Sequence, residues 1–142
     1  MDYAAARLAS ARTLCCAEVL KYTADTKDGG QGAPNIWPVP ASQRALDAAG
    51  LKAADIDYWE INEAFCIVAL NCIKELGLDP DRVNVMGGGT AIGHPLGATG
   101  IRLTGTLARI LAEKGGRYGC SNACVGGGQG VATIIERETY GW

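Results

Sequence analysis

The chain has 142 residues, of which 48% are hydrophobic and 20% charged, with a formal net charge of -2. These values are typical of one globular domain, so we expect residues 1–142 to form a single domain. Lysines and arginines are scattered, and the lack of a basic stripe argues against nucleic acid as a partner. The longest apolar stretch, Ala64 to Leu70, is far shorter than the roughly 20 residues that cross a bilayer, so no membrane span is expected.

The N-terminal elements are predicted from hydrophobic period and from glycine and proline breaks. We expect a helix from Ala4 to Thr13 and a strand from Leu14 to Asp25. The glycine- and proline-rich segment from Gly29 to Ala41 is long for a loop, and such a loop either contacts a ligand or neighbouring subunit or is a plain surface connection. A short helix over Ser42 to Ala49 should end at Gly50.

Strands and helices are expected to alternate after Gly50. The helix from Glu63 to Leu76 is apolar nearly all round, which predicts a buried helix. The other expected elements are a strand over Ile56–Ile61, a short strand over Val83–Met86, a helix over Ala98–Lys114, and strands over Arg117–Cys124 and Val131–Glu136. This order predicts a layered α/β fold, in which helices cover a mixed sheet that ends in an antiparallel hairpin.

The six cysteines form no CxxC pair. Cys120 and Cys124 on one strand would lie roughly 13 Å apart, too far for a disulfide or a shared metal ion. We therefore expect reduced thiols, no metal site and a cytoplasmic protein. The N-terminal segment rich in Arg, Ala and Ser faintly resembles an organelle-targeting peptide, although Asp2 favours an ordinary helix, so mitochondrial or peroxisomal location is the alternative.

His94 is the only histidine, and it lies in a glycine-dense loop between a predicted strand and helix. An imidazole titrates near neutral pH, so it can take a proton from a thiol or hydroxyl. Flanking glycines leave room for a substrate to approach. The loop therefore presents His94 as a candidate general base, and the alternative is a histidine that only completes a turn.

Cys124 and Asn62 each carry two interpretations. Cys124 precedes the glycine turn of the hairpin, where its thiol can exchange a proton and nearby backbone N–H groups can stabilise an oxyanion. Its alternative role is that of a small buried hydrophobic residue. Asn62 either caps the following helix or orients a water or carbonyl, and one residue can do both. Neither glycine run fits a phosphate-binding loop or a dinucleotide fingerprint, which argues against nucleotide chemistry.

Three segments in series carry a specific resemblance. They are NEAF at 62–65, GGGTAIGHPLGATG at 87–100 and CVGGGQG at 124–130, and together they closely resemble the C-terminal half of thiolases, with the likeness covering roughly Pro38 to Glu136. The resemblance implies a five-stranded α/β half-domain. It also implies acyl-CoA as substrate, no covalently bound cofactor, and either cleavage of 3-ketoacyl-CoA by CoA or condensation of two acetyl-CoA units. Thiolases further suggest a homo-oligomer.

The resemblance also assigns roles to single residues. His94 is similar to the base that activates a nucleophilic cysteine, and Cys124 to the second cysteine, which exchanges a proton with the substrate carbon or the leaving CoA thiol. Asn62 is similar to the residue that holds a water which completes one oxyanion hole with His94. The Gly126 N–H resembles part of the second oxyanion hole.

The chain departs from thiolases in lacking an equivalent of their nucleophilic cysteine, which lies in the N-terminal half of the enzyme. Cys15 and Cys16 fall in a predicted strand, and Cys66 and Cys72 on the helix predicted to be buried. We therefore expect the N-terminal domain to be absent and the isolated chain to be inactive unless a partner chain supplies it. The alternatives are a non-catalytic binding or assembly module and a hydrolase that uses Cys124 as nucleophile and His94 as base.

Overall fold

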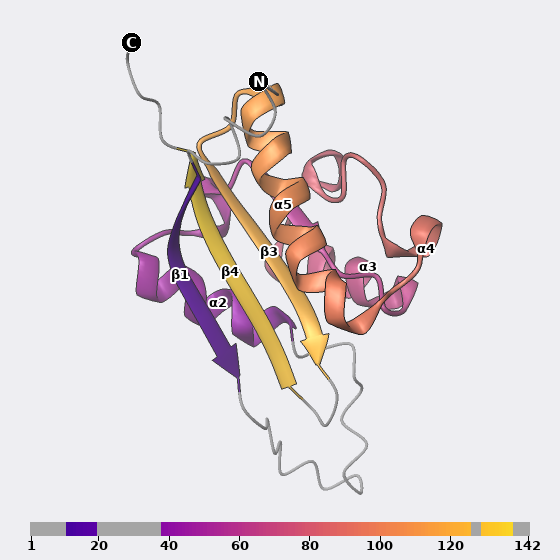
Figure 1. The fold of residues 1–142 in the computed structure, drawn as a ribbon. Helices are drawn as coiled ribbons and strands as arrows, with labels where there is room; N and C mark the ends of the chain where they lie inside the picture. The colour runs from indigo at the N-terminus through magenta and orange to yellow at the C-terminus, as the bar shows by residue number, and fades with distance from the viewer. Residues whose placement is uncertain (1–10, 20–37, 126–128, 138–142) are drawn as a thin grey trace, which may run out of the picture.

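The computed structural model describes residues 11–19, 38–125 and 129–137 (Figure 1). Its elements in chain order are β1 (Ala11–Val19), α2 (Pro38–Ala49), the 3-10 turn η1 (Ala53–Asp55), β2 (Tyr58–Ile61), α3 (Cys66–Leu76), the 3-10 turn η2 (Pro80–Arg82), α4 (Gly89–Ile92), α5 (Leu96–Lys114), β3 (Tyr118–Val125) and β4 (Gln129–Arg137). Within these ranges, no helix is both long and apolar enough to cross a membrane.

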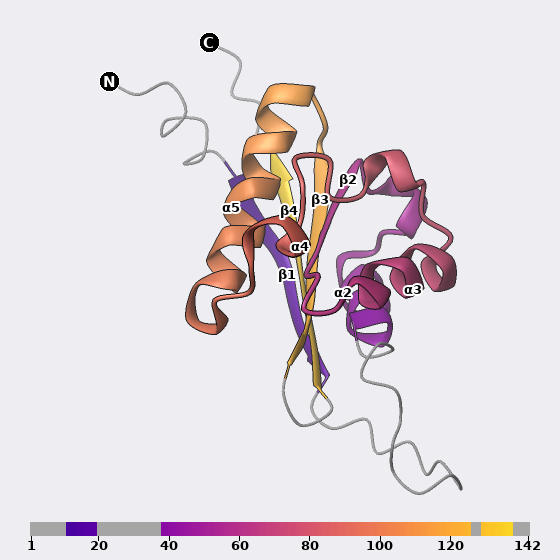
Figure 2. The same ribbon diagram turned by 90° about the vertical axis from the view of Figure 1, so that its right-hand side faces the viewer.

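Four strands form one mixed sheet in the order β1-β4-β3-β2. Strand β4 pairs antiparallel with both β1 and β3, whereas β2 pairs parallel with β3, with Ile61 opposite Asn122. Figure 2 shows the sheet almost edge-on, with α5 on one face and α2 and α3 on the other. The predicted α/β fold with a mixed sheet and a C-terminal antiparallel hairpin is therefore confirmed.

Each face of the sheet has its own apolar core. The core under α5 contains Leu107, Leu111 and Ile135. Gly119 permits this packing, because a Cβ there would lie 2.7 Å from a methyl carbon of Leu107. The larger core lies under α2 and α3, and includes Trp59, Ile61, Val68, Cys72, Cys120, Ala132 and Ile134.

The N-terminal predictions are confirmed only in part. The strand predicted from Leu14 exists, but β1 begins at Ala11, so residues 11–13 are strand rather than the end of a helix. Residues 4–10 of the predicted helix and 20–25 of the predicted strand lie outside the described residues, as does most of the loop predicted over Gly29 to Ala41. That loop is too long as predicted, because α2 begins at Pro38, where proline suits a first helical turn.

The short strand predicted over Val83–Met86 is wrong. Val83 forms only an isolated parallel bridge with Trp59. The next residue, Asn84, has a φ of +49°, and its carbonyl accepts from the Gly87 N–H at 2.8 Å, so the chain turns away from the sheet. The five strands implied by the thiolase resemblance are therefore four strands and a bridge among the described residues.

The helix predicted from Glu63 to Leu76 is shorter and less buried than expected. It begins at Cys66, because residues 62–65 are not helical and the N-cap residue Phe65 has an extended backbone. Only Val68, Ala69 and Cys72 are buried within it. Its outward side leaves apolar residues uncovered, so the prediction of a fully buried helix is wrong.

Candidate active site

The ends of two parallel strands define the candidate site. Because β2 and β3 are parallel, their last residues lie at the same end of the sheet. Asn62 follows β2 directly, and its backbone N–H donates to the Asn122 carbonyl at 2.9 Å, which extends the ladder by one residue. Cys124 is the last residue but one of β3. Two of the three residues proposed for catalysis, Asn62 and Cys124, thus lie at the same end of two neighbouring strands.

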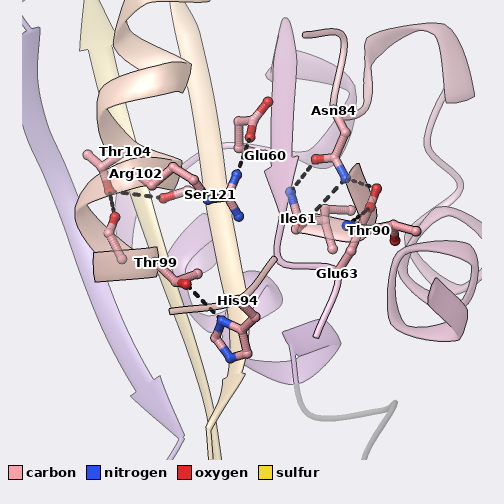
Figure 3. A network of polar contacts seen from close by, with 11 residues as sticks. Glu60, Ile61, Glu63, Asn84, Thr90, His94, Thr99, Arg102, Thr104 and Ser121 are labelled. Atoms are coloured by element: carbon pink, nitrogen blue, oxygen red, sulfur yellow. Dashed lines mark hydrogen bonds and ion pairs between the residues drawn. The ribbon is translucent and has the colours of Figure 1, made fainter. Parts of the chain in front are cut away.

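The loop between α4 and α5 brings His94 to Asn62. Gly93 closes α4 with a φ of +90°, which favours glycine, and Pro95 is the N-cap residue of α5. The His94 ring has a polar partner at each nitrogen. Nε2 lies 3.4 Å from Asn62 Nδ2, and Nδ1 lies 2.7 Å from Thr99 Oγ1 (Figure 3). Sequence reasoning missed Thr99, because only the folded loop reveals its hydroxyl beside the ring.

Asn62 does not cap the following helix. The N-cap position of α3 belongs to Phe65, and no side chain caps it. The Asn62 side chain is instead fully buried, and its Oδ1 has no hydrogen-bond partner in the described part of the chain. The capping interpretation is therefore wrong, and the interpretation in which the amide orients a water or a carbonyl stays a prediction.

A polar clamp formed by Glu63, Asn84 and Thr90 fixes the backbone around Asn62 (Figure 3). The Glu63 carboxylate accepts from Asn84 Nδ2 at 2.7 Å and from the Thr90 N–H at 2.9 Å. Asn84 also pairs with the Ile61 backbone, accepting from its N–H at 2.8 Å and donating to its carbonyl at 3.0 Å. The side chain of Asn84 thus replaces the strand predicted here.

The same clamp explains the ionisation of Glu63 and one of the glycines. Partial burial alone would raise the pKa of Glu63, but the hydrogen bonds from Thr90 and Asn84 outweigh it and lower the pKa below its ordinary value. A Cβ on Gly88 would collide with this carboxylate. The glycine run before His94 therefore lets the loop pack directly on Glu63.

Cys124 lies at the same end of the sheet as His94 but packs from the other side. Its half-buried side chain contacts the core under α2 and α3, whereas His94 is bonded to Thr99 on α5. Burial raises the pKa of the Cys124 thiol. Among the described residues, no hydrogen bond joins Cys124 to His94 or Asn62. Gly126, proposed for an oxyanion hole, lies outside the described residues.

A buried ion pair between β2 and α5 was also missed from the sequence. Glu60 is fully buried, and its Oε2 lies 4.0 Å from Arg102 Nη1 (Figure 3). Neither Glu60 oxygen has a hydrogen-bond partner in the described ranges. Burial raises the pKa of Glu60 to about 7, although Arg102 opposes the rise. The available signal was a single glutamate within the otherwise apolar strand Tyr58–Ile61.

His94 and Asn62 are placed so that a proton can be transferred next to an amide hydrogen-bond donor. His94 can exchange a proton at Nε2, and the Asn62 amide lies next to that nitrogen. Across the described ranges, no three His, Cys, Asp or Glu side chains are grouped as they would be around a metal ion. The chemistry supported by these residues is acid–base chemistry.

Comparison with protein families gives one match, to the family model described as "Thiolase, C-terminal domain", over residues 14–137. The chain is 52% identical over 103 residues to a 3-ketoacyl-CoA thiolase of Hahella chejuensis, a match that covers 70% of this chain and 26% of that protein. An acetyl-CoA acetyltransferase of Schizosaccharomyces pombe is 52% identical over 100 residues, covering 70% of this chain and 25% of that protein.

Solved structures show the same likeness in three dimensions. Human mitochondrial 3-ketoacyl-CoA thiolase superposes with a TM-score of 0.81 at 40% sequence identity, covering 91% of this chain and 31% of that one. The same enzyme has also been solved in complex with CoA. The chain therefore spans about a quarter of the length of the curated relatives that it matches.

Proposed function

The chain belongs to the thiolase family, matching its C-terminal domain, and from this premise we propose that it supplies His94, Asn62 and Cys124 to a site that cleaves or forms 3-ketoacyl-CoA. The observation that carries the proposal is the contact between His94 Nε2 and Asn62 Nδ2 at the end of the sheet. Acyl transfer to a thiol needs a base for the nucleophile and hydrogen-bond donors for the oxyanion. His94 is the proposed base, and the Asn62 amide is a proposed donor.

The proposed step at His94 is a proton transfer. A nucleophilic cysteine gives its thiol proton to Nε2, which leaves a thiolate and an imidazolium. The thiolate then bonds to the acyl carbon, whose C=O electron pair moves onto oxygen. The new Nε2–H, together with a water held by Asn62, is placed to stabilise that oxyanion, and the Gly126 N–H is proposed for the second oxyanion hole.

Cys124 is proposed as the second acid–base group. Its raised pKa favours the thiol, which is the form that donates a proton to the leaving CoA sulfur or to a carbanion. The same rise argues against the alternative of a hydrolase with Cys124 as nucleophile, since a nucleophile must be a thiolate. The missing hydrogen bond between Cys124 and His94 argues against it too.

The nucleophile is proposed to come from a thiolase N-terminal half, supplied by a partner chain or by further sequence. Burial raises the pKa of Cys72 to about 12, which makes that thiol inert. The outward side of α3 supports docking of another half, because Phe65 and Leu70 are 61% and 60% exposed. The relatives are about four times longer than the matched segment, so they contain enough additional chain to cover this face.

Reconstitution tests the proposal. The chain is produced together with the N-terminal portion of the Hahella chejuensis relative, and thiolysis of acetoacetyl-CoA by CoA is measured. We expect turnover from the pair and none from the chain alone. His94→Ala should lower the rate at least about a hundredfold. Arg109→Ala, a change at an exposed position on α5, should leave the rate unchanged.

The outcome also separates the enzyme from a binding module. A pair that co-purifies and binds CoA but does not turn over would favour a non-catalytic assembly role. Turnover by the chain alone would show instead that it holds its own nucleophile. The mass of the active assembly gives the oligomeric state, for which a homo-oligomer is proposed, and cell fractionation tests the proposed cytoplasmic location against the mitochondrion of the human relative.

A further inference from the structure

Thr99 makes two hydrogen bonds that bear on which nitrogen of His94 carries the proton. Its Oγ1 lies 2.9 Å from the Pro95 carbonyl and 2.7 Å from His94 Nδ1 (Figure 3). A carbonyl can only accept, so the single hydroxyl hydrogen of Thr99 goes to Pro95. With that hydrogen directed to Pro95, Oγ1 accepts from Nδ1, and Nδ1 then carries the ring proton.

We propose that Thr99 is a positioning residue that holds neutral His94 in the Nδ1–H tautomer and keeps Nε2 as the proton acceptor of the site. The inference rests on the proposed function for the meaning of that acceptor. The Asn62 contact agrees with it, since an amide N–H at 3.4 Å from Nε2 needs a lone pair there. In this role Thr99 acts through His94 and touches no substrate.

The local sequence places this pair of hydrogen bonds in the first turn of α5. Thr99 is four residues after Pro95, the spacing at which a threonine hydroxyl bonds back to a helix carbonyl. The Thr99 side chain is buried, so water does not compete for its hydroxyl. Its bond to Nδ1 is present before and after Nε2 gains a proton, so proton transfer requires no rearrangement of the ring.

One competing network has the same heavy-atom positions. If Thr99 donated to Nδ1, Nε2 would carry the proton, and Asn62 would have to turn its oxygen toward the ring. His94 would then be unable to accept a thiol proton at Nε2. The two networks differ in a single measurable property, the nitrogen that holds the proton.

Nitrogen-15 NMR of the imidazole reads that property directly in this chain. His94 is the only histidine, so a long-range proton–nitrogen correlation spectrum contains one ring and needs no assignment. At a pH where the ring is neutral, we expect Nδ1 to be protonated and Nε2 unprotonated. A spectrum with the proton on Nε2 would overturn the proposal without any variant.

Matched variants then assign the effect to Thr99. Thr99→Val, which keeps the shape but lacks the hydroxyl, should move the ring toward the Nε2–H form or a mixture, and Thr99→Ser should restore the wild-type spectrum. Thr104→Val removes another hydroxyl that bonds back to its helix and should leave the ring unchanged. An unchanged tautomer in folded Thr99→Val would contradict the role of Thr99.

Reconstituted enzyme separates this inference from the proposed function. With an N-terminal half present, we expect Thr99→Val to lower kcat by at least about tenfold while KM stays within about twofold. Thr99→Ser should keep most of the rate. The predicted tautomer in an inactive pair would contradict only the function, whereas an active pair with the proton on Nε2 would contradict only the role of Thr99.

Discussion

Helices α5 and α3 lie on opposite faces of one sheet, and they bury their apolar side chains to different degrees (Figure 2). Along α5, Leu103, Leu107, Ile110 and Leu111 are all buried. Beside and along α3, Phe65, Ile67 and Leu70 are exposed, and none of the described residues covers them. From Leu103 onward, α5 is thus closed by the chain itself. The first turns of α5, where Leu96 and Ile101 are 85% and 81% exposed, and the α3 layer have the surface expected where another domain docks.

Loss of packing under α5 should have the largest effect. Leu107 is fully buried against Gly119 and Ile135, so Leu107→Ala should lower the free energy of unfolding by about 2–5 kcal/mol through lost burial and the cavity left behind. Urea unfolding followed by circular dichroism measures the change. Arg109→Ala on the exposed side of α5 is the control, and a similar loss in both would show that α5 is not closed as described.

The buried Glu60 on the α5 side should make stability depend on pH. Its pKa is about 7 in the folded chain and 4.5 when unperturbed, so the folded state binds more protons between these values. The contribution of Glu60 to the free energy of unfolding is therefore fully present below pH 4.5 and is lost as the pH rises to about 7. The shift corresponds to about 3 kcal/mol.

Glu60→Gln should remove that pH dependence while keeping the side-chain shape. Unfolding free energies at pH 5, 6, 7 and 8 would be compared between Glu60→Gln and the original chain, with Glu113→Gln at an exposed position as control. The advantage of Glu60→Gln should grow with pH over this range. A constant difference would mean that Glu60 ionises normally beside Arg102.

The sequence predicted best those elements whose apolar face is covered by this chain. Strand β4 and helix α5 bury one face against the chain itself, so period and glycine breaks gave their positions within a few residues. The exposed side of α3 was not predictable, because an apolar helix surface is the same in sequence whether this chain or another covers it. The site was predicted as His94, Cys124 and Asn62, but the supporting Thr99 and Asn84 act through contacts that exist only in the fold.

The Asn84 turn holds the end of β2 and the segment that follows it, and its loss should have an intermediate effect. Asn84→Ala removes the bonds to the Ile61 backbone and to Glu63, which should cost about 1–3 kcal/mol because the Ile61 groups lose their partners. Asn84→Gly separates this from backbone strain, since glycine accepts the φ of +49°. Stability restored by glycine would show that conformation, not the side-chain bonds, holds this turn.

The smallest effect on the chain alone is expected at the open face of α3. Leu70 is mostly exposed, so Leu70→Gln should change the free energy of unfolding by less than about 0.5 kcal/mol. If a thiolase N-terminal half docks here, the same change should weaken its binding by at least about tenfold, since a polar amide would then be buried without a partner. Titration calorimetry with the purified half measures this, with Lys114→Gln on α5 as a control away from α3. Equal binding of both variants would mean that the open face of α3 is not the docking surface, and a stability loss as large as that of Leu107→Ala would mean that it is not open.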